Sequence, residues 1–284
     1  MIDHEFVKEC IRPRKADSHK GENGVVMIVG GSWMYHGAPF LAAMAALRCG
    51  VDLAYIAAPE KIIPSIRALS PAIIAIPLTD MKLTRGAARR ILNTLSRVDS
   101  IVIGPGLDSG SEPGIDLVVK KATALGKGLV LDAAALYPGI LKLASGERVV
   151  LTPHAGEFKR VFGIDVPKET EERVKVVQDN ARKNEVTILL KGKIDVISNG
   201  VETAINETGS PAMTTGGTGD VLSGIVAAFL AWETEPFKAA ASAAWINGKA
   251  GELAFSKLGL HMIATDLINE IPNVMKDFDR IVGD

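Results

Sequence analysis

Seven short apolar runs recur along the chain, and this repetition is the feature that most limits how it can fold. Each run has the length of a strand and is followed by a turn and a helical stretch; the runs span 25–29, 53–57, 73–76, 100–103, 129–131, 149–151 and 186–190. Because they are apolar throughout rather than alternating, they are typical of parallel strands covered by helices on both faces. We therefore predict an α/β fold with a doubly wound, mostly parallel sheet flanked by helices on both faces.

The pattern changes after residue 190. Two runs, 194–198 and 201–206, flank Asn199-Gly200, which is a strong signal for a β-hairpin. We predict an antiparallel hairpin at one edge of the sheet, followed by two helices rich in small residues over 221–231 and 237–255. The sequence contains no linker, low-complexity tract or repeat, so a single domain spanning 1–284 is expected.

Composition excludes several classes of partner. The 32 Lys and Arg residues balance 33 Asp and Glu residues, for a formal net charge of -1, so we expect no binding to nucleic acid or to an anionic membrane surface. The apolar run over 221–232 is shorter than the ~20 residues that span a bilayer. Cys10 and Cys49 have no partner cluster, which suits a reducing compartment. The cytoplasm is the expected location.

Ligands of open parallel sheets bind outside the carboxyl ends of the strands, so functional residues are expected in the loops that follow the apolar runs. The segment from Gly30 to Pro39 has glycines that either let a ligand approach the backbone or allow tight packing between strand and helix. The second loop begins Gly104-Pro105-Gly106, and its next glycine is Gly110. This spacing does not match the dinucleotide-binding fingerprint.

Two further loops carry charged side chains. His154 and Glu157 have a spacing compatible with metal ligands, but a glutamate that caps a helix and a histidine that lines a site are favoured. Lys191 and Lys193 follow the last apolar run of the series. They either meet phosphate groups or form a solvated pair before the hairpin.

The fifth loop is the most informative, because Gly216, Gly217 and Gly219 stand directly before an apolar helix. Their free backbone N–H groups and the helix dipole predict an anion hole. No Walker motif is present, and Asp220 stands where that motif has its lysine. Asp220 is either a helix cap or a general base for a hydroxyl that attacks phosphorus. We expect its carboxylate to be ionised at neutral pH. We also expect Gly219 to tolerate no side chain, because a Cβ would intrude on the anion hole and would demand a backbone angle that glycine adopts most easily.

The segment TTGGTGDVLSG resembles the anion-hole motif of ribokinase-like kinases, in which the aspartate is the base. Together with GGSWMYHGAP, GPGL, LDAAAL, LTPHAGE and LLKGKID, in that order, it makes most of the chain similar to the ADP/ATP-dependent (6S)-NAD(P)H-hydrate dehydratases. This resemblance implies a lyase that uses ADP to dehydrate the (6S)-hydrate of NADH or NADPH to NAD(P)H, with release of AMP and phosphate. It also implies that Mg²⁺ bridges the phosphates, although the sequence does not identify protein ligands for the ion. The family resemblance further implies a homotetramer.

The resemblance assigns residues to two groups, with Asp220 as the catalytic base. The residues implied to face the hydrate are Ala38, Gly106, His154 and Asp220. Those implied to bind the nucleotide are Lys191, Gly192, Lys193, Ile194, Asp195, Gly216, Gly217 and Gly219.

Some positions depart from the family pattern. Asp132 is followed by Ala133 and Ala134, where relatives often have a second aspartate, and many relatives carry an N-terminal epimerase domain where this chain has only a short segment before Gly24. We expect the epimerase to be a separate protein or absent. Two alternative functions are a kinase of the same superfamily acting on a small hydroxymethyl compound, and a catalytically silent nucleotide-binding protein. An intact Asp220 argues against the silent protein.

Overall fold

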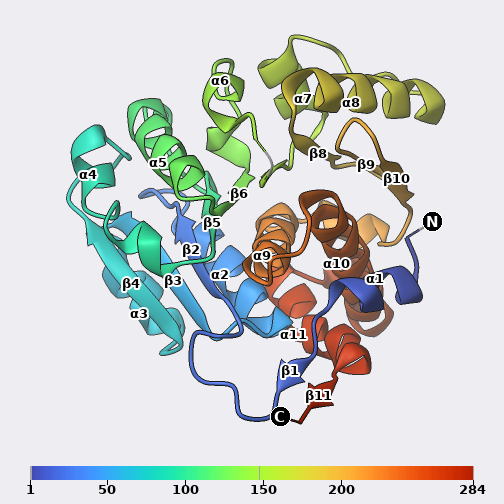
Figure 1. Cartoon of the computed structure of the whole chain (residues 1–284), viewed down its shortest axis with the longest axis horizontal. Coiled ribbons are helices and arrows are strands. Elements are labelled where there is room, and N and C mark those ends of the chain that lie inside the picture. Colours follow the sequence, from blue (N-terminus) through green and yellow to red (C-terminus); the bar gives the residue numbers. More distant parts are fainter. Residues whose placement is uncertain (1, 147, 284) are drawn as a thin grey trace.

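The computed structural model describes residues 2–146 and 148–283, and its main feature is a sheet with the strand order β10-β9-β8-β7-β6-β5-β2-β3-β4 (Figure 1). The strands from β4 to β8 pair in parallel, whereas β9 is antiparallel to both β8 and β10. The predicted fold class and edge hairpin are confirmed. The strands are β2 (Val25–Val29), β3 (Leu53–Pro59), β4 (Ile73–Leu78), β5 (Ser100–Ile103), β6 (Gly128–Leu131), β7 (Val149–Leu151), β8 (Thr187–Leu190), β9 (Asp195–Ser198) and β10 (Thr203–Asn206).

Helices cover both faces of the sheet, which explains why the strands are apolar throughout. In β2, Val26 and Ile28 join the core on one face, while Met27 and Val29 join the core on the other. The first core is closed by α1 (His4–Cys10), α2 (Ala38–Cys49), α3 (Ile63–Leu69), α9 (Thr218–Ala231), α10 (Pro236–Leu258) and α11 (Ala264–Met275). The second is closed by α4 (Arg85–Arg89), α5 (Glu112–Ala124), α6 (Leu141–Ala144), α7 (Ala155–Phe162) and α8 (Thr170–Asn184).

The small residues of α9 allow the close helix packing that the sequence predicts. A Cβ placed on Gly224 would lie 2.0 Å from the carbonyl oxygen of Ala42 in α2. Only glycine avoids this clash. The two helices therefore pack with their backbones in near contact, at Ala42 of α2 and at Gly224 in the second turn of α9.

The hairpin turn is formed as predicted, but β10 begins later than expected. The side-chain oxygen of Asn199 accepts hydrogen bonds from the amides of Val201 (2.9 Å) and Glu202 (2.7 Å), and Gly200 has a φ of 90°. Val201 and Glu202 thus belong to the turn, since their amides bond to Asn199 and not to a neighbouring strand.

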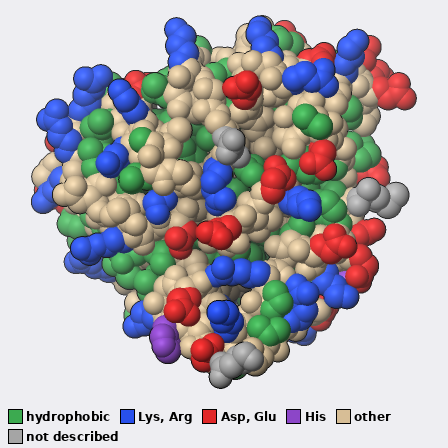
Figure 2. Space-filling view, viewed as in Figure 1, with side chains coloured by type: hydrophobic (Ala, Val, Ile, Leu, Met, Phe, Trp, Pro, Cys, Tyr) green, Lys and Arg blue, Asp and Glu red, His purple; other side chains and the backbone are tan. Residues whose placement is uncertain are grey.

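A short parallel pair, β1 (Arg14–Lys15) with β11 (Ile281–Val282), ties the two ends of the chain together. The sequence does not predict this pair, because two-residue strands carry no detectable pattern. No helix within 2–146 and 148–283 is both long and apolar enough to cross a membrane. Figure 2 shows basic and acidic side chains interspersed on the visible face, with Lys and Arg gathered at its left, over α4 and α5.

Candidate active site

β2 and β5 are neighbours at the centre of the sheet; the chain adds β3 and β4 on one side of β2, and then β5 and the later strands on the other side. The loops that follow β2 and β5 lie against each other. The amide of Gly31 donates to the carbonyl oxygen of Pro105 at 2.8 Å. A Cβ on Gly30 would lie 2.3 Å from that same oxygen. The same Cβ would lie 3.3 Å from the Cβ of Pro39 in the first turn of α2. Glycine at this position therefore allows close packing against the second loop, and against the helix as one of the two sequence interpretations expects.

Ala38 and Gly106, predicted to face one ligand, are neighbours. Gly106 has a φ of +71°, and a Cβ there would lie 3.1 Å from the Cβ of Ala38. One turn further along α2, the side chain of Leu41 would meet a Cβ on Gly217 at 2.6 Å. The first turns of α2 therefore connect the Gly106 loop with the glycine turn before α9.

The glycine turn has one position that requires glycine for its backbone, and it is Gly217 rather than Gly219. Gly217 has a φ of 99° and precedes α9, whereas Gly219 lies inside the first turn of that helix. The backbone angle expected at Gly219 was wrong, because a helical residue needs no left-handed angle. A Cβ on Gly219 would lie 3.4 Å from the Nζ of Lys191, an ordinary contact distance, so the lysine lies directly beside the first turn of α9.

Lys191, which follows β8, is the centre of a charged cluster. The other members are Asp132, Glu157 of α7 and Asp220 of α9. The Nζ of Lys191 lies 2.9 Å from Oδ1 of Asp132 and 3.8 Å from Oε2 of Glu157. Asp132, which follows β6, is 2% exposed, and Asp220 acts on the same lysine by its charge. Burial by itself would lower the pKa of Lys191, but the carboxylates, above all that of Asp132, raise it above its ordinary value. The lysine therefore stays cationic at the N-terminus of α9.

Asp220 titrates near neutrality. Burial is the main cause that raises its pKa to about 7, the charge of Asp132 raises it further, and the charge of Lys191 opposes the rise. The expectation that the carboxyl is ionised at neutral pH was therefore wrong, because burial and the charges of Asp132 and Glu157 raise the pKa more than the charge of Lys191 lowers it. A carboxyl that exchanges its proton near pH 7 is suited to general base catalysis.

Asp132 stands on a strained turn. Ala133 has a φ of 49°, a left-handed conformation that costs a residue with a side chain about 1 kcal/mol or more. Arg160 of α7 holds this turn, since its Nη2 donates to the carbonyl of Ala133 at 2.8 Å and its Nε to that of Leu136 at 2.6 Å. A Cβ on Gly104 would lie 1.8 Å from the carbonyl oxygen of Asp132, so this glycine makes room for the turn.

His154 caps α7 and lies at the rim of the site. Its Nδ1 accepts from the amide of Gly156 at 3.0 Å, while Oε2 of Glu157 accepts from the amide of His154 at 2.9 Å. The predicted capping glutamate is confirmed. The side chain of His154 is 60% exposed, and no group of three or more metal-ligating residues occurs in the part of the chain that the structure describes.

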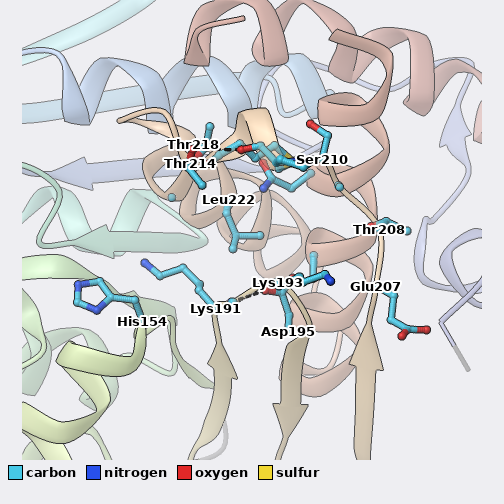
Figure 3. A pocket seen from close by; sticks show the side chains of 18 residues that line it. His154, Lys191, Lys193, Asp195, Glu207, Thr208, Ser210, Thr214, Thr218 and Leu222 are labelled. Atoms are coloured by element: carbon cyan, nitrogen blue, oxygen red, sulfur yellow. Dashed lines mark hydrogen bonds between the residues drawn. The ribbon is translucent and has the colours of Figure 1, made fainter. Parts of the chain in front are cut away.

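A cavity of about 590 Å³ opens beside this cluster, and Figure 3 shows His154 and Lys191 at its left and Thr208 and Glu207 at its right. Lys193 and Leu222 also line it. The carbonyl oxygen of Ile194 accepts a hydrogen bond from Nη2 of Arg173 at 3.2 Å. The cavity is lined by His154, Lys191, Gly192, Lys193, Asp195, Glu207, Thr208, Gly209, Ser210, Pro211, Met213, Thr214, Thr218, Gly219, Leu222, Ala244, Asn247 and Gly248.

Asp195 lines the cavity but uses both carboxylate oxygens within the protein. Oδ1 accepts from the amide of Gly192 at 2.9 Å, and Oδ2 accepts from Nδ2 of Asn206 at 3.0 Å. This side chain therefore fixes the turn that carries Lys191 and Lys193.

Two polar side chains of this region are not among the site residues predicted from the sequence. Asp132 follows an apolar strand directly, and that position at the carboxyl end of a parallel strand was a usable signal. Asn247 lies in the middle of α10, where no local pattern distinguishes it from its neighbours.

Known proteins resemble the chain over nearly its whole length. The model of the NAD(P)H-hydrate dehydratase family matches residues 26–273. An ADP-dependent (S)-NAD(P)H-hydrate dehydratase from Nitrosopumilus maritimus is 50% identical, over 98% of this chain and 97% of that protein. The ADP/ATP-dependent NAD(P)H-hydrate dehydratase from Bacillus subtilis, co-crystallised with ATP and Mg²⁺, is 29% identical with a TM-score of 0.81 and covers 97% of each chain. A ribokinase-like superfamily protein from Enterococcus faecalis is 26% identical with a TM-score of 0.83, over 97% of this chain and 95% of that one.

Proposed function

The chain belongs to the NAD(P)H-hydrate dehydratase family, and on this premise we propose that it uses ADP to dehydrate the (6S)-hydrate of NADH or NADPH. The products are NAD(P)H, AMP and phosphate. The single observation that carries the proposal is the meeting of Asp220, Gly219 and Lys191 at the N-terminus of α9, with the Lys191 Nζ 3.4 Å from the position of a Gly219 Cβ. A base, an anion-binding turn and a cation at one point are what phosphoryl transfer requires.

The reaction proceeds in two steps. The ring hydroxyl of the hydrate attacks the β-phosphorus of ADP as Asp220 takes its proton, so that a C–O–P linkage forms and AMP leaves. The phosphorylated oxygen then departs as phosphate while the neighbouring ring carbon loses a proton, which restores the C=C bond of the dihydronicotinamide. Because the pKa of Asp220 is about 7, a large fraction of the carboxylate is ready to accept a proton at neutral pH.

We assign the two substrates to opposite sides of Asp220. Ala38, Gly106 and His154 are assigned to the hydrate. The contact between the Gly106 loop and α2 supports this assignment for Ala38 and Gly106. The phosphates of ADP meet the amides of the turn from Gly216 to Gly219 and the ammonium group of Lys191. Lys191 supplies the charge that a Walker lysine supplies elsewhere, and the remaining nucleotide residues are Gly192, Lys193, Ile194 and Asp195.

Mg²⁺ is proposed to bind through the phosphate oxygens of the nucleotide, where it would neutralise charge on the group being transferred. The carboxylates of Asp132 and Glu157 are already engaged by Lys191, and the described residues contain no group of three or more metal-ligating side chains. We further propose that the chain forms a single domain and assembles as a homotetramer. A cytoplasmic location is also proposed, because the two cysteines are free and free thiols suit a reducing compartment.

The test is to incubate the purified protein with (6S)-NADH hydrate, ADP and Mg²⁺, and to follow the recovery of reduced-nicotinamide absorbance and the formation of AMP. We expect NADH and AMP to appear in equal amounts. Asp220→Asn should lower kcat by at least about 100-fold, since a positioned base contributes about 10²–10⁴ in rate. Asp165→Asn is the matched control. The side chain of Asp165 is 80% exposed, so this variant should leave turnover unchanged.

Two results would contradict the proposal. If ATP alone supports turnover and ADP does not, the assigned phosphoryl donor is wrong. If the protein phosphorylates a thiazole or pyridoxal alcohol and leaves the hydrate untouched, it is a kinase of the same superfamily.

A further inference from the structure

Ala133 has a backbone conformation that residues with a side chain disfavour. Three non-glycine residues in the described part of the chain have a positive φ, and they are Ala133, Glu185 and Glu233. Glu185 caps the C-terminus of α8 and Glu233 follows the C-cap of α9, where left-handed residues are common. Ala133 instead begins the short 3₁₀ turn Ala133–Ala135, directly after Asp132. A strained residue of this kind persists only where the surrounding structure fixes it.

The anchor of this turn is Arg160, which belongs to α7. The turn Ala133–Ala135 consists of alanines, so it has no polar side chain of its own to stabilise it. Nη2 of Arg160 donates to the carbonyl oxygen of Ala133 at 2.8 Å, and Nε donates to that of Leu136 at 2.6 Å. The planar guanidinium therefore spans the turn from its first residue to the residue that ends it, which a single ammonium group does not reproduce.

The position of Asp132 depends on this turn, because Asp132 directly precedes it. The carbonyl oxygen of Asp132 accepts from the amide of Ala135 at 2.9 Å, and a Cβ on Gly104 would lie 1.8 Å from the same oxygen. The carboxylate of Asp132 lies 2.9 Å from the Nζ of Lys191. Relaxation of φ at Ala133 would rotate the peptide that joins it to Asp132 and carry the carboxylate away from the lysine.

Helix α7 thus acts on Lys191 from two successive turns. Glu157, in the first turn, places its Oε2 3.8 Å from the Nζ of Lys191. Arg160 lies three residues later, on the same side of the helix, and fixes the turn that carries Asp132. The Nζ of Lys191 in turn lies 3.4 Å from the position of a Gly219 Cβ, at the start of α9.

We propose that Arg160 is a positioning residue, which holds Asp132 against Lys191 and thereby fixes the ammonium group at the start of α9. The inference rests on the proposed function, because that function gives Lys191 the task of binding the phosphate groups of ADP. Arg160 acts through the Asp132 turn and not through contact with a substrate. Its side chain is exposed, so its replacement leaves the hydrophobic core intact.

This role predicts the direction in which the titration of Asp220 moves. Three charged groups act on Asp220, and they are Asp132, Lys191 and Glu157. The charge of Asp132, which raises the pKa, acts more strongly than that of Lys191, which lowers it. If Arg160→Met releases Asp132, the midpoint therefore moves to lower pH, whether or not Lys191 moves as well. Loss of a cation that acts directly on Asp220 would move the midpoint to higher pH.

The test is a carbon NMR titration of the Asp220 carboxyl in the ligand-free protein, with its resonance identified by its loss in Asp220→Asn. Arg160→Met should move the midpoint to lower pH by at least about 0.5. Lys159→Met is the matched control, because Lys159 is the adjacent exposed cation of α7 and pairs with Asp165, and it should leave the midpoint in place. Adding Ala133→Gly to Arg160→Met should restore the wild-type midpoint, because glycine adopts a positive φ without an anchor.

A midpoint that is unchanged or higher in Arg160→Met would overturn the proposal, as would failure of Ala133→Gly to restore it. If Arg160→Met does not fold, Arg160→Lys carries the same test, since it keeps a cation but cannot bond both carbonyl oxygens. In turnover assays, Arg160→Met should also lower kcat by roughly 10- to 100-fold, and an unchanged kcat would overturn the positioning role.

The titration separates this inference from the proposed function, because it needs neither ADP nor hydrate. The expected movement of the midpoint in a protein that dehydrates nothing would support the hold of Arg160 on Asp132 and refute the proposed function. An unchanged midpoint in a protein that dehydrates the hydrate would refute this inference alone.

Discussion

Replacing Asp220 by Asn should make the folded protein more stable at alkaline pH, while it removes the proposed base. The carboxyl has an ordinary pKa of 3.8 and a folded-state pKa of about 7. It therefore holds its proton more tightly in the folded state than in the unfolded one, and the folded state is penalised once it must lose that proton. Asn keeps the size of the side chain and never ionises.

The size and sign of the effect follow from this difference. A difference of about 3 pKa units corresponds to about 4 kcal/mol at 1.36 kcal/mol per unit, and the partial exposure of the carboxyl reduces it to roughly 2–3 kcal/mol. Below pH 3.8 both states are protonated, so the two proteins differ little for this reason. The advantage of Asp220→Asn then grows as the pH rises from about 4 to about 7 and is constant above that.

The assay is thermal unfolding of the wild type and Asp220→Asn at pH 5 and at pH 8, with Asp165→Asn as the exposed control. At roughly 2–4 °C per kcal/mol for a domain of this size class, the Tm of Asp220→Asn should exceed that of the wild type by several degrees at pH 8 and by clearly less at pH 5. An Asn variant that is less stable than the wild type at pH 8, or whose gain is the same at both pH values, would refute the argument from burial.

Four other predictions concern the same site. The kcat/KM of the wild type should rise with pH through about 7 as Asp220 loses its proton, and a profile that is flat between pH 6 and 8 would exclude that group as the base. Lys191→Met should move this midpoint to higher pH, because the cation that opposes the rise in pKa is gone, and should weaken ADP binding in calorimetry. Gly217→Ala should lower stability by about 1–3 kcal/mol in thermal unfolding, whereas Gly216→Ala, with open space around its Cα, should not. His154→Asn, which preserves the helix cap, should raise the KM for the hydrate and leave ADP affinity unchanged; the opposite pattern would place His154 on the nucleotide side.

Local sequence determined the elements and several of the contacts. Continuous apolar runs fix strands such as β2 because a strand with two buried faces needs apolar side chains at every position. Asn199-Gly200 fixes the hairpin through side-chain and backbone preferences that act within four residues. His154 and Glu157 form their capping box within one helical turn, and the glycines before Asp220 mark an anion-binding helix start by the same kind of short-range rule.

Tertiary structure alone decided the electrostatics and the ligand-facing surface. Lys191 meets Asp132 across 59 residues of sequence, and the order of the strands that brings them together is not written in any local pattern. The pKa of Asp220 depends on burial beneath elements distant in the chain, so a rule based on the helix dipole gave the wrong protonation. Asn247 is an ordinary helical residue in sequence, but where α10 packs on the loop over 207–214 its Oδ1 is buried and has no hydrogen-bond partner within 2–146 and 148–283. Helix and strand signals are short-range, whereas desolvation and hydrogen-bond satisfaction depend on all the neighbours that folding supplies.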